Sequence, residues 1–346
     1  MTSRRRRSRK KKSSGAAGVL LGALFFALLA AGAVGWLMLT PYGPSSETFV
    51  DIAPGTSTIA MGRQLQTAGV VRSKFAFYAL RWFEKERLRA GHYRFDHPVP
   101  LTEVYQRIAR GDVFTIALTV PEGANIFDIA ARAEQAHLGT REEFLKAAAD
   151  QAKLVSDLDP GAVSLEGYLF PDTYRFAHDV TAEQMTAAMV ARFRAVAAQL
   201  GLKENVHRIV TIASLVERET AVESERPLVA SVFSNRLNKQ MPLGTDPAVI
   251  YGLELEGKWR GAIYASDLKN DTAYNTYLHG GLPPGPIANP GVPSLKAAMQ
   301  PAESNYLYFV AAGNNPQGHS VFSETLDEHS RNVAGYRKAI KRAGAR

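Results

Sequence analysis

The sequence contains no cysteine and, outside its first residues, no excess of charge of either sign. Without cysteine the chain can have no disulfide framework, no thiolate metal site and no cysteine nucleophile. Its 346 residues include 41 basic and 33 acidic side chains, but eight of the basic ones lie between Arg4 and Lys12, before the first acidic residue, Glu47. The rest of the chain is therefore neutral. Nucleic-acid binding needs a basic face on a folded domain, so that function class is not expected.

Signatures of cofactor and metal sites are also missing from the sequence. No glycine-rich loop has the spacing that holds a phosphate or a dinucleotide. His279 and His319 have no further histidine or acidic residue at ligand spacing, so they are expected to be loop residues. Neither a cofactor nor a metal is predicted.

One long segment, residues 18–39, has no charged residue. As a helix its 22 residues would span about 33 Å, enough for a hydrocarbon core of about 30 Å. A cleaved signal peptide is the alternative, but the apolar run exceeds the usual signal core of about 7–15 residues. The basic tail 1–17 precedes the span and is expected to stay in the cytoplasm. The sequence thus predicts a single-pass protein of the cell (inner) membrane with a periplasmic or extracytoplasmic body.

The exported body begins with a linker, residues 40–47, and then mixes strand and helix patterns, which predicts an α+β fold. Residues 48–115 form the first expected unit. Its elements are strand 48–52, a helix from Ser57 or Thr58, helix 73–84, strand 91–95 and helix 101–110. Strand–helix–helix–strand on this scale loosely resembles a LysM-type glycan-binding module, although a plain α/β spacer would have the same pattern.

Two further parts are expected: a second α/β unit, residues 116–204, and a catalytic domain of mixed α/β type, residues 205–346. The first should contain strand 114–120, helices 126–136, 140–154 and 181–200, and an irregular loop at 165–176. The second should contain a helix from His207 to about Thr220, helix 226–237, strands 306–310 and 320–322 around a turn at 313–318, and a final helix from Leu326.

Two carboxylates, Glu217 and Glu219, stand at the end of the apolar helix that begins at His207. Residues at i and i+2 lie about 200° apart around a helix, so the two side chains cannot enter one cleft together. The apolar pattern does not choose between them. Each could instead simply pair with an arginine such as Arg218 or Arg226.

The segments that follow, residues 242–252, 271–277 and 280–291, are rich in Tyr, Asn, Asp, Thr, Gly and Pro and are expected to be loops. Tyrosine stacks on sugar faces and the short polar side chains bond hydroxyls, so this composition favours a glycan cleft. The candidate substrate-binding residues are Glu217, Asp246, Tyr251, Tyr274, Asn275 and Tyr277. For each of them a bond that only stabilises a loop is the alternative, and Glu217 is expected to orient a loop or pair with an arginine.

Five segments together resemble the endolytic murein transglycosylases, the MltG or YceG-like family. They are EGYLFPDTY (166–174), ASLVERETAVESER (213–226), TDPAVIYG (245–252), TAYNTY (272–277) and GLPPGPIANPG (281–291). The resemblance implies a short cytoplasmic tail, one membrane helix, a LysM-like module and a lytic transglycosylase domain. It also implies that the catalytic residue is the glutamate directly before threonine in the E-x-E-T run, which is Glu219.

The implied reaction is endolytic cleavage of the MurNAc–GlcNAc bond in nascent glycan strands, which leaves 1,6-anhydro-MurNAc ends and terminates elongation. A single carboxyl can serve, because the substrate supplies its own nucleophile. Cleavage with water, as in a muramidase, is one alternative. A non-catalytic membrane scaffold that binds glycan and peptidoglycan synthases is the other. The partners that the resemblance suggests are glycan strands and such synthases.

Overall fold

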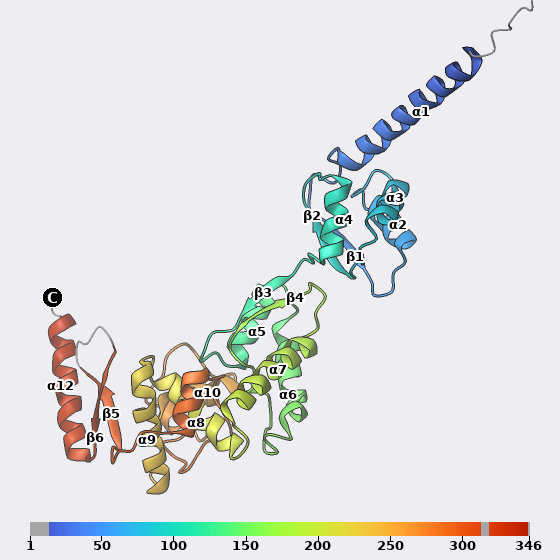
Figure 1. The fold of residues 1–346 in the computed structure, drawn as a ribbon. Coiled ribbons are helices and arrows are strands. Elements are labelled where there is room, and N and C mark those ends of the chain that lie inside the picture. The colour runs from blue at the N-terminus through green and yellow to red at the C-terminus, as the bar shows by residue number, and fades with distance from the viewer. Residues whose placement is uncertain (1–13, 313–317, 345–346) are drawn as a thin grey trace, which may run out of the picture. The chain divides into compact units, whose positions relative to one another are not determined.

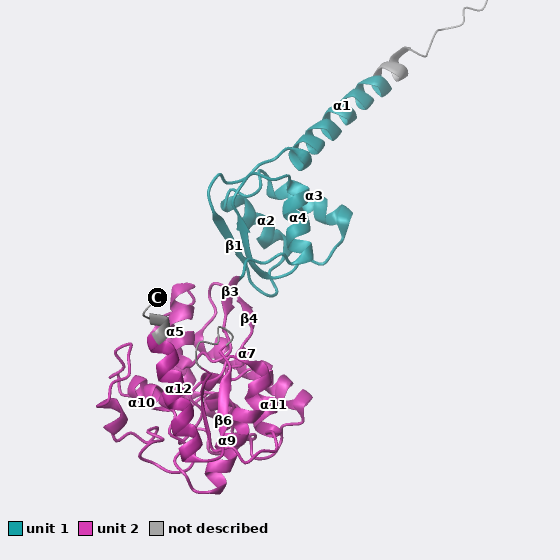
Figure 2. Cartoon of the chain, turned by 90° about the vertical axis from the view of Figure 1, so that its left-hand side faces the viewer, with its two compact units in different colours: residues 1–115 teal, residues 116–346 magenta. Residues whose placement is uncertain are grey.

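A computed structural model of the chain describes residues 14–312 and 318–344 (Figure 1). Most of the predicted tail and of the predicted turn at 313–318 lies outside the described residues. The chain divides into two compact units, residues 1–115 and 116–346 (Figure 2). Among the described residues, helices dominate and the strands form three separate antiparallel pairs. The coarse prediction of a fold that mixes helices and strands is confirmed.

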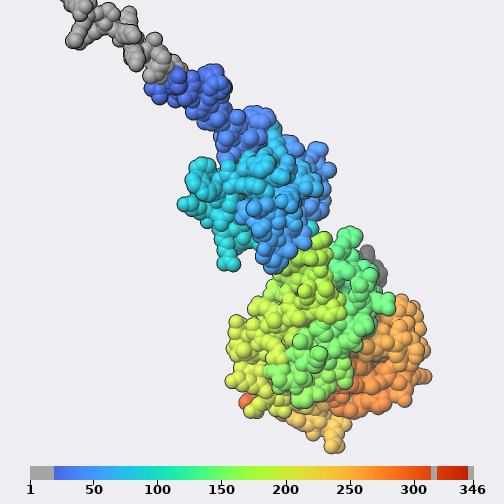
Figure 3. Space-filling view, turned by 90° about the vertical axis from the view of Figure 1, so that its right-hand side faces the viewer, coloured from blue at the N-terminus to red at the C-terminus, as the bar shows by residue number. Residues whose placement is uncertain are grey.

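The first unit begins with helix α1, Ser14–Leu39, which contains the uncharged segment. Its part Val19–Leu39 has a mean hydropathy of 2.2 and is not buried within the protein (Figure 3, dark blue). The helix is long and apolar enough to cross a membrane, a property that it shares with signal sequences. At its end, Met38 packs against the core of the unit and the Arg72 guanidinium lies 4.0 Å from the centre of the Trp36 ring.

The rest of the first unit is a small helical layer on a two-stranded sheet. The elements are β1 (Thr48–Ile52), α2 (Thr58–Thr67), α3 (Lys74–Glu84), β2 (Gly91–Phe95) and α4 (Leu101–Arg110). Strand β1 pairs with β2, and its alternating side chains Val50 and Ile52 enter the core. The hydroxyls of Ser57 and Ser73 accept hydrogen bonds from N–H groups in the first turns of α2 and α3, which fixes where these helices begin. The predicted elements of this unit are confirmed to within a residue.

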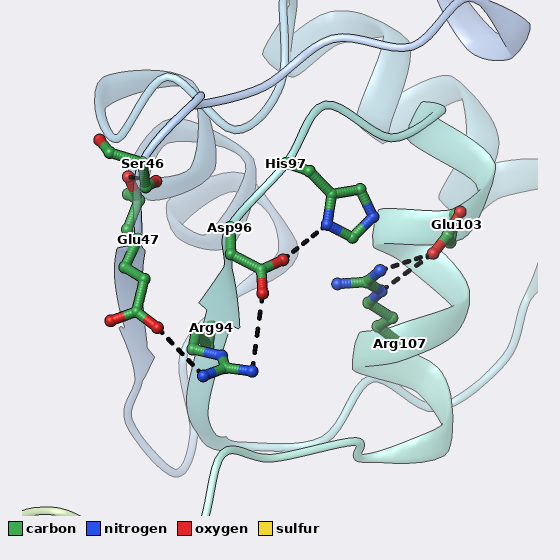
Figure 4. Close-up of polar contacts among 8 residues, drawn as sticks. Ser46, Glu47, Arg94, Asp96, His97, Glu103 and Arg107 are labelled. Carbon is green, nitrogen blue, oxygen red and sulfur yellow. Dashed lines mark hydrogen bonds and ion pairs between the residues drawn. The ribbon is translucent and has the colours of Figure 1, made fainter.

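Several charged side chains of this unit form ion pairs with one another (Figure 4). Arg94 of β2 pairs with Glu47 at 3.1 Å and with Asp96 at 3.6 Å. On α4, Glu103 and Arg107 pair across one helical turn at 2.6 Å. These groups are partly exposed to solvent, and such pairs add little to stability. The apolar core therefore holds the unit together.

The second unit starts with a layer of helices beside a short sheet. Its elements are β3 (Ile116–Thr119), α5 (Ile126–Gln135), α6 (Arg141–Asp150), a 3-10 helix (Ala152–Val155), β4 (Thr173–Phe176) and α7 (Ala182–Leu200). Strand β4 pairs with β3, so the prediction that 165–176 is irregular throughout was wrong for its last four residues. Residues 173–176 do alternate polar and aromatic side chains, but this short run directly follows Pro171 and Asp172, which are typical of turns.

The remaining elements carry the site. They are α8 (Val206–Glu219), a 3-10 turn (Glu223–Glu225), α9 (Arg226–Asn238), α10 (Asp246–Leu255), a 3-10 turn (Asp267–Lys269), α11 (Val292–Met299), β5 (Tyr308–Ala311), β6 (Ser320–Ser323) and α12 (Leu326–Gly344). The expectation of a loop at 242–252 was wrong from Asp246 onward, where α10 begins, whereas the loop expected at 280–291 is confirmed and α11 begins directly after it. Both helices carry proline in the first turn, where its missing N–H costs no helical hydrogen bond.

Helix α8 is the central helix of the second unit. Val206, Val210 and Ala213 belong to an apolar cluster built mainly from residues 118–202. Ile212, Leu215 and Val216 belong to another, formed with residues of α9, α10 and the C-terminal hairpin. The helix thus packs against apolar clusters on two sides. These contacts join the segments before and after residue 204, so the boundary predicted there falls inside one compact unit.

Candidate active site

Glu219 is the last residue of α8, and the chain leaves the helix directly after it. Thr220 has an extended backbone, with φ −140° and ψ 131°. The buried stripe of α8 fixes the direction of this end, so the carboxyl is carried by one of the most firmly held segments of the unit.

The Glu219 carboxyl faces a cavity of about 610 Å³. The Thr245 hydroxyl donates a hydrogen bond to its Oε1 at 2.5 Å. Burial raises the pKa of Glu219 above its usual value; the Thr245 bond opposes this shift, the charge of Asp246 adds to it, and the charge of Arg236 opposes it. A carboxyl of this kind can hold its proton at a higher pH than an exposed glutamate.

Polar and aromatic side chains from four elements form the cavity wall. They include Arg236 of α9, Asp246 of α10, Tyr277, Tyr308 of β5 and His329 of α12. The Tyr277 hydroxyl donates to Asp246 Oδ1 at 2.8 Å, and the Tyr277 ring is 42% exposed. The cavity therefore holds a second carboxylate, Asp246, besides Glu219.

Arg236 is fixed by the backbone of two loops that border the cavity. Its Nε donates to Leu307 O and its Nη1 to Leu243 O, both at 2.6 Å. Its guanidinium lies 5.2 Å from the centre of the Tyr308 ring, on which His329 stacks at 5.1 Å. Burial lowers the pKa of both Arg236 and His329. The arginine brings a positive charge near Glu219 without a direct ion pair among the described contacts.

Glu217 points elsewhere, as helix geometry requires. Its Oε1 pairs with Arg226 Nη2 at 2.8 Å, and its Oε2 accepts a hydrogen bond from Gly291 N at 2.9 Å. Its side chain is only 4% exposed. The expected pairing with an arginine is confirmed, and the structure does not bring Glu217 to the cavity wall.

A second, closed group of polar side chains surrounds Glu166, and we call it the Glu166 cluster: Glu166, Tyr251, Tyr274 and Asn289. The Glu166 carboxyl accepts hydrogen bonds from Ile126 N at 2.9 Å and Asn289 Nδ2 at 3.0 Å, and it bonds the Tyr251 hydroxyl. Burial raises the pKa of Glu166 to about 8. The rings of Tyr251 and Tyr274 pack edge to face at 5.0 Å.

The Glu166 cluster joins segments that lie far apart in the sequence. Asn289 also donates to Ala124 O and accepts from Leu169 N. Gly167 adopts a φ of +87°, and a Cβ there would lie 2.6 Å from Pro286, so only glycine allows this approach. Of the predicted contact residues, Tyr251 is thus buried and Tyr274 is partly buried, and neither lines the Glu219 cavity.

Asn275 is placed inside its own loop. It is fully buried, and its side-chain amide donates to the carbonyls of Leu268 and Asn270 at 3.0 and 2.8 Å. Its Oδ1 accepts from Tyr277 N at 3.0 Å, which orients the residue that lines the cavity. Of the six predicted contact residues, the structure brings Asp246 and Tyr277 to the cavity with Glu219.

Sequence reasoning missed Thr245, Arg236, Tyr308 and His329. Thr245 directly precedes Asp246 in a segment proposed from its composition for the glycan cleft, so its hydroxyl could have been predicted as a site group. Arg236 and His329 lie in ordinary helical patterns, and Tyr308 in a strand pattern, so nothing in the sequence separates them from surface or core residues. Over residues 14–312 and 318–344, no three His, Asp or Glu side chains are placed to hold a metal ion.

A carboxyl with a raised pKa, on a rigid helix end and open to a cavity lined by tyrosines, is the arrangement expected of an enzyme that uses general acid–base chemistry. Residues 50–335 match the model of the YceG-like family. An endolytic murein transglycosylase of Bacillus subtilis (strain 168) is 35% identical over 331 residues, which cover 88% of this chain and 90% of that protein.

Two further relatives agree. An endolytic murein transglycosylase of Streptococcus pneumoniae (strain D39) is 31% identical over 90% of this chain, which spans 63% of that longer protein. The crystal structure of a YceG-like protein from Listeria monocytogenes is 32% identical, with a TM-score of 0.53, over 83% of this chain and 99% of its own. The chain belongs to the YceG-like family. The predictions of this family and of an enzyme of the murein transglycosylase type are confirmed.

Proposed function

We propose that the Glu219 cavity binds a peptidoglycan glycan strand and cleaves a MurNAc–GlcNAc bond within it, leaving a 1,6-anhydro-MurNAc end. The names of the relatives support the substrate class. The observation that carries the assignment is the position of Glu219, whose carboxyl has a raised pKa and opens on a cavity of about 610 Å³. Glu217, by contrast, has both oxygens engaged elsewhere.

In the proposed reaction Glu219 acts twice. Its carboxyl first gives a proton to the glycosidic oxygen, as the bond between that oxygen and the MurNAc anomeric carbon breaks. The carboxylate then takes the proton of the MurNAc 6-hydroxyl, whose oxygen forms the new bond to the same carbon. Glu219 ends protonated, and no water is consumed. Because the nucleophile belongs to the substrate, proximity supplies part of the acceleration.

The surroundings of Glu219 suit both halves of this cycle. Burial favours the protonated acid that the first step needs. The Thr245 hydroxyl and the charge of Arg236 favour the carboxylate that exists between the steps. Asp246 and Tyr277, joined by their hydrogen bond, are the groups we assign to sugar hydroxyls.

Hydrolysis by water is the second candidate, and one observation favours it. Asp246 lies in the same cavity as Glu219, and hydrolytic glycosidases usually use two carboxyl groups. In that reaction the cleaved strand would carry a reducing MurNAc end. The two products differ by the mass of one water molecule.

Digestion of purified glycan strands, with the products weighed, tests the proposal. The wild-type chain should release internal fragments with anhydro ends, and Glu219→Gln should release none while keeping its circular dichroism spectrum. Glu217→Gln is the matched control, since it sits on the same turn and should keep the anhydro product. Reducing ends from the wild type would favour hydrolysis, and unchanged cleavage by Glu219→Gln would overturn the assignment.

The rest of the chain fits a role at the membrane. We propose that α1 stays in the membrane as a single-pass anchor, with the N-terminal tail in the cytoplasm and both units on the outer side. The first unit would act as a LysM-like glycan-binding module, and cleavage near the membrane would end the growth of nascent strands beside peptidoglycan synthases. A wild-type chain that cleaves no strand but binds glycan would instead support a scaffold.

A further inference from the structure

Helix α3 of the first unit exposes apolar side chains that the unit itself does not use. Phe77 and Leu80 are buried in the core. On the other side, Phe75, Trp82 and Phe83 are 70%, 72% and 66% exposed. A helix that is apolar on both sides needs a second apolar neighbour. These three residues, with Ile59 of α2, form what we call the aromatic face.

Contacts join the aromatic face in two groups: Tyr78 links Phe75 to Ile59, and Trp82 contacts Phe83. The rings of Phe75 and Tyr78 meet edge to face at 6.0 Å, and the Tyr78 hydroxyl donates to Ile59 O at 2.8 Å. Ile59 is itself 58% exposed. At the other end of α3, the rings of Trp82 and Phe83 meet at 5.2 Å. Two exposed aromatic groups therefore lie on one short helix, and exposed clusters of this kind mark interaction sites.

The aromatic face starts where α1 ends. The Arg72 guanidinium, just before α3, lies 4.0 Å from the centre of the Trp36 ring and 5.1 Å from that of Tyr42. Helix α1 contacts both α3 and α4, and Figures 1 and 2 both draw α3 beside the outer end of α1. The residues of this end, Trp36 to Tyr42, are those that would meet the boundary between lipid and water.

Charge around α3 matches an anionic surface. Residues 74–89 contain five basic and two acidic side chains, whereas the chain after its first 12 residues has equal numbers of the two. Lys74 Nζ lies 5.3 Å from the centre of the Phe75 ring, and Lys85 and Arg87 are exposed just beyond Trp82 and Phe83. Aromatic rings beside basic residues are typical of helices that lie in the headgroup region of a bilayer.

We propose that α3 lies on the surface of the membrane that α1 crosses, with the aromatic face among the lipids and the adjoining basic residues on anionic phospholipid headgroups. This inference rests on the proposed membrane anchor. The contact would hold the first unit against the bilayer at two places, α1 and α3, and so fix its orientation to the membrane plane.

The three tryptophans of the chain, Trp36, Trp82 and Trp259, allow a direct test. Three full-length variants keep one tryptophan each, with the other two changed to phenylalanine, and are reconstituted into vesicles of phosphatidylglycerol and phosphatidylcholine. Lipids brominated on their acyl chains quench nearby tryptophans. We expect Trp82 to lose emission to a similar extent as Trp36. Trp259, in the second unit, should keep its emission.

Two substitutions sharpen the test. In the chain that keeps only Trp82, Phe75→Ser with Phe83→Ser should restore most of the lost emission. Val163→Ser, at an exposed apolar residue of the second unit, is the matched control and should restore none. Vesicles without phosphatidylglycerol should quench Trp82 less, because they lack the anionic headgroups.

The failures of the two proposals can be told apart. If Trp36 is quenched and Trp82 behaves as Trp259 does, the anchor stands and the contact of α3 is overturned. If Trp36 also escapes quenching, the anchor itself fails. If soluble glycan strands shift the Trp82 emission in detergent micelles while brominated lipids leave it unchanged, the aromatic face binds glycan, and the membrane contact is overturned.

Discussion

Two buried carboxyls in the second unit, Glu166 and Glu219, share a raised pKa but differ in their hydrogen-bond partners and in their access to open space. Glu166 is enclosed: backbone and side-chain N–H groups from three segments point at it, and the cavity beside it has a volume of only about 10 Å³. Among the described residues, the Glu219 side chain has one hydrogen-bond partner, the Thr245 hydroxyl, and it faces a cavity of about 610 Å³. Burial is the leading cause of the raised pKa at both.

The difference teaches that a perturbed carboxyl alone does not locate an active site. Structural networks also shift pKa values, as the Glu166 cluster does. What distinguishes Glu219 is that its carboxyl can still accept hydrogen bonds and that it borders a cavity. A substrate oxygen can reach such a group, whereas the oxygens of Glu166 are already occupied. Substitutions can separate a carboxyl that holds the fold from one that is free to react.

The largest effect is expected for Glu219→Gln. Loss of a general acid should lower the rate of strand cleavage by at least about a hundredfold. The unfolding free energy should stay within about 1 kcal/mol of the wild type, since only one hydrogen bond is altered. Cleavage assays and urea unfolding measure the two quantities on the same samples. A loss of stability as large as the loss of activity would mean that Glu219 is structural.

Glu166→Gln should give the opposite pattern. One side-chain oxygen becomes an amide nitrogen, which cannot accept from Ile126 N or from the donors on the other oxygen. A buried donor left unpaired costs about 1–3 kcal/mol, so the unfolding free energy should fall by about that amount. The cleavage rate of the folded fraction should change far less than in Glu219→Gln. Unaltered stability would contradict the role given to the Glu166 cluster.

The same residue predicts how stability depends on pH. The pKa of Glu166 is about 8 in the folded chain, against 4.5 as the ordinary value. Its contribution to stability is therefore complete below about pH 4.5 and is lost as the pH rises through about 8. The Tm of the wild type should fall over this window, and the fall should be smaller in Glu166→Gln. Equal slopes in both proteins would show that other groups cause the change.

Thr245→Val tests the tuning of Glu219. The substitution keeps the shape of the side chain and removes the donor that favours the carboxylate. The pKa of Glu219 should rise further above its usual value. Because the first step needs the protonated acid, kcat/KM falls as the pH rises through this pKa, and that fall should move to higher pH in the variant. A pH profile of kcat/KM that does not move would exclude this role for the hydroxyl.

The smallest effect is expected for Tyr277→Phe. It removes one hydrogen bond to the exposed carboxylate of Asp246, worth about 0.5–1.5 kcal/mol, and so should raise KM by about two- to tenfold. Tyr274→Phe is the matched control, because Tyr274 lies outside the Glu219 cavity and should leave KM unchanged. A larger effect from Tyr274 than from Tyr277 would reverse the assignment of the two tyrosines.

The sequence was most informative where a pattern of apolar residues is compatible with only one type of secondary structure. The stripe Ile209, Ile212, Ala213 and Val216 predicted the helix that carries Glu219, and helix geometry predicted that Glu217 and Glu219 diverge. The opening of α10 was predicted to be a loop because of the composition of residues 242–252, although proline is also common in the first turn of a helix.

The members of the cavity wall could not be derived in this way. From composition alone, Tyr251 and Tyr277 are equally good candidates for sugar binding. Only the packing of their segments places Tyr251 in the interior and Tyr277 in the cavity. Arg236 and Leu307 are 71 residues apart, and their contact depends on how the C-terminal hairpin meets α9. Such long-range contacts leave no periodic trace in the sequence.

The place of Glu219 at the C-terminal end of α8 has one more consequence. Aligned peptide dipoles give that end of a helix a partial negative charge, close to the last carbonyl groups. This partial charge repels a second negative charge, so the helix disfavours the carboxylate form of Glu219 and helps to raise its pKa. The backbone of α8 thus contributes to the raised pKa of Glu219. A substitution that frays the last turn of α8 should lower this pKa and leave less of Glu219 protonated, without changing any side chain in the cavity.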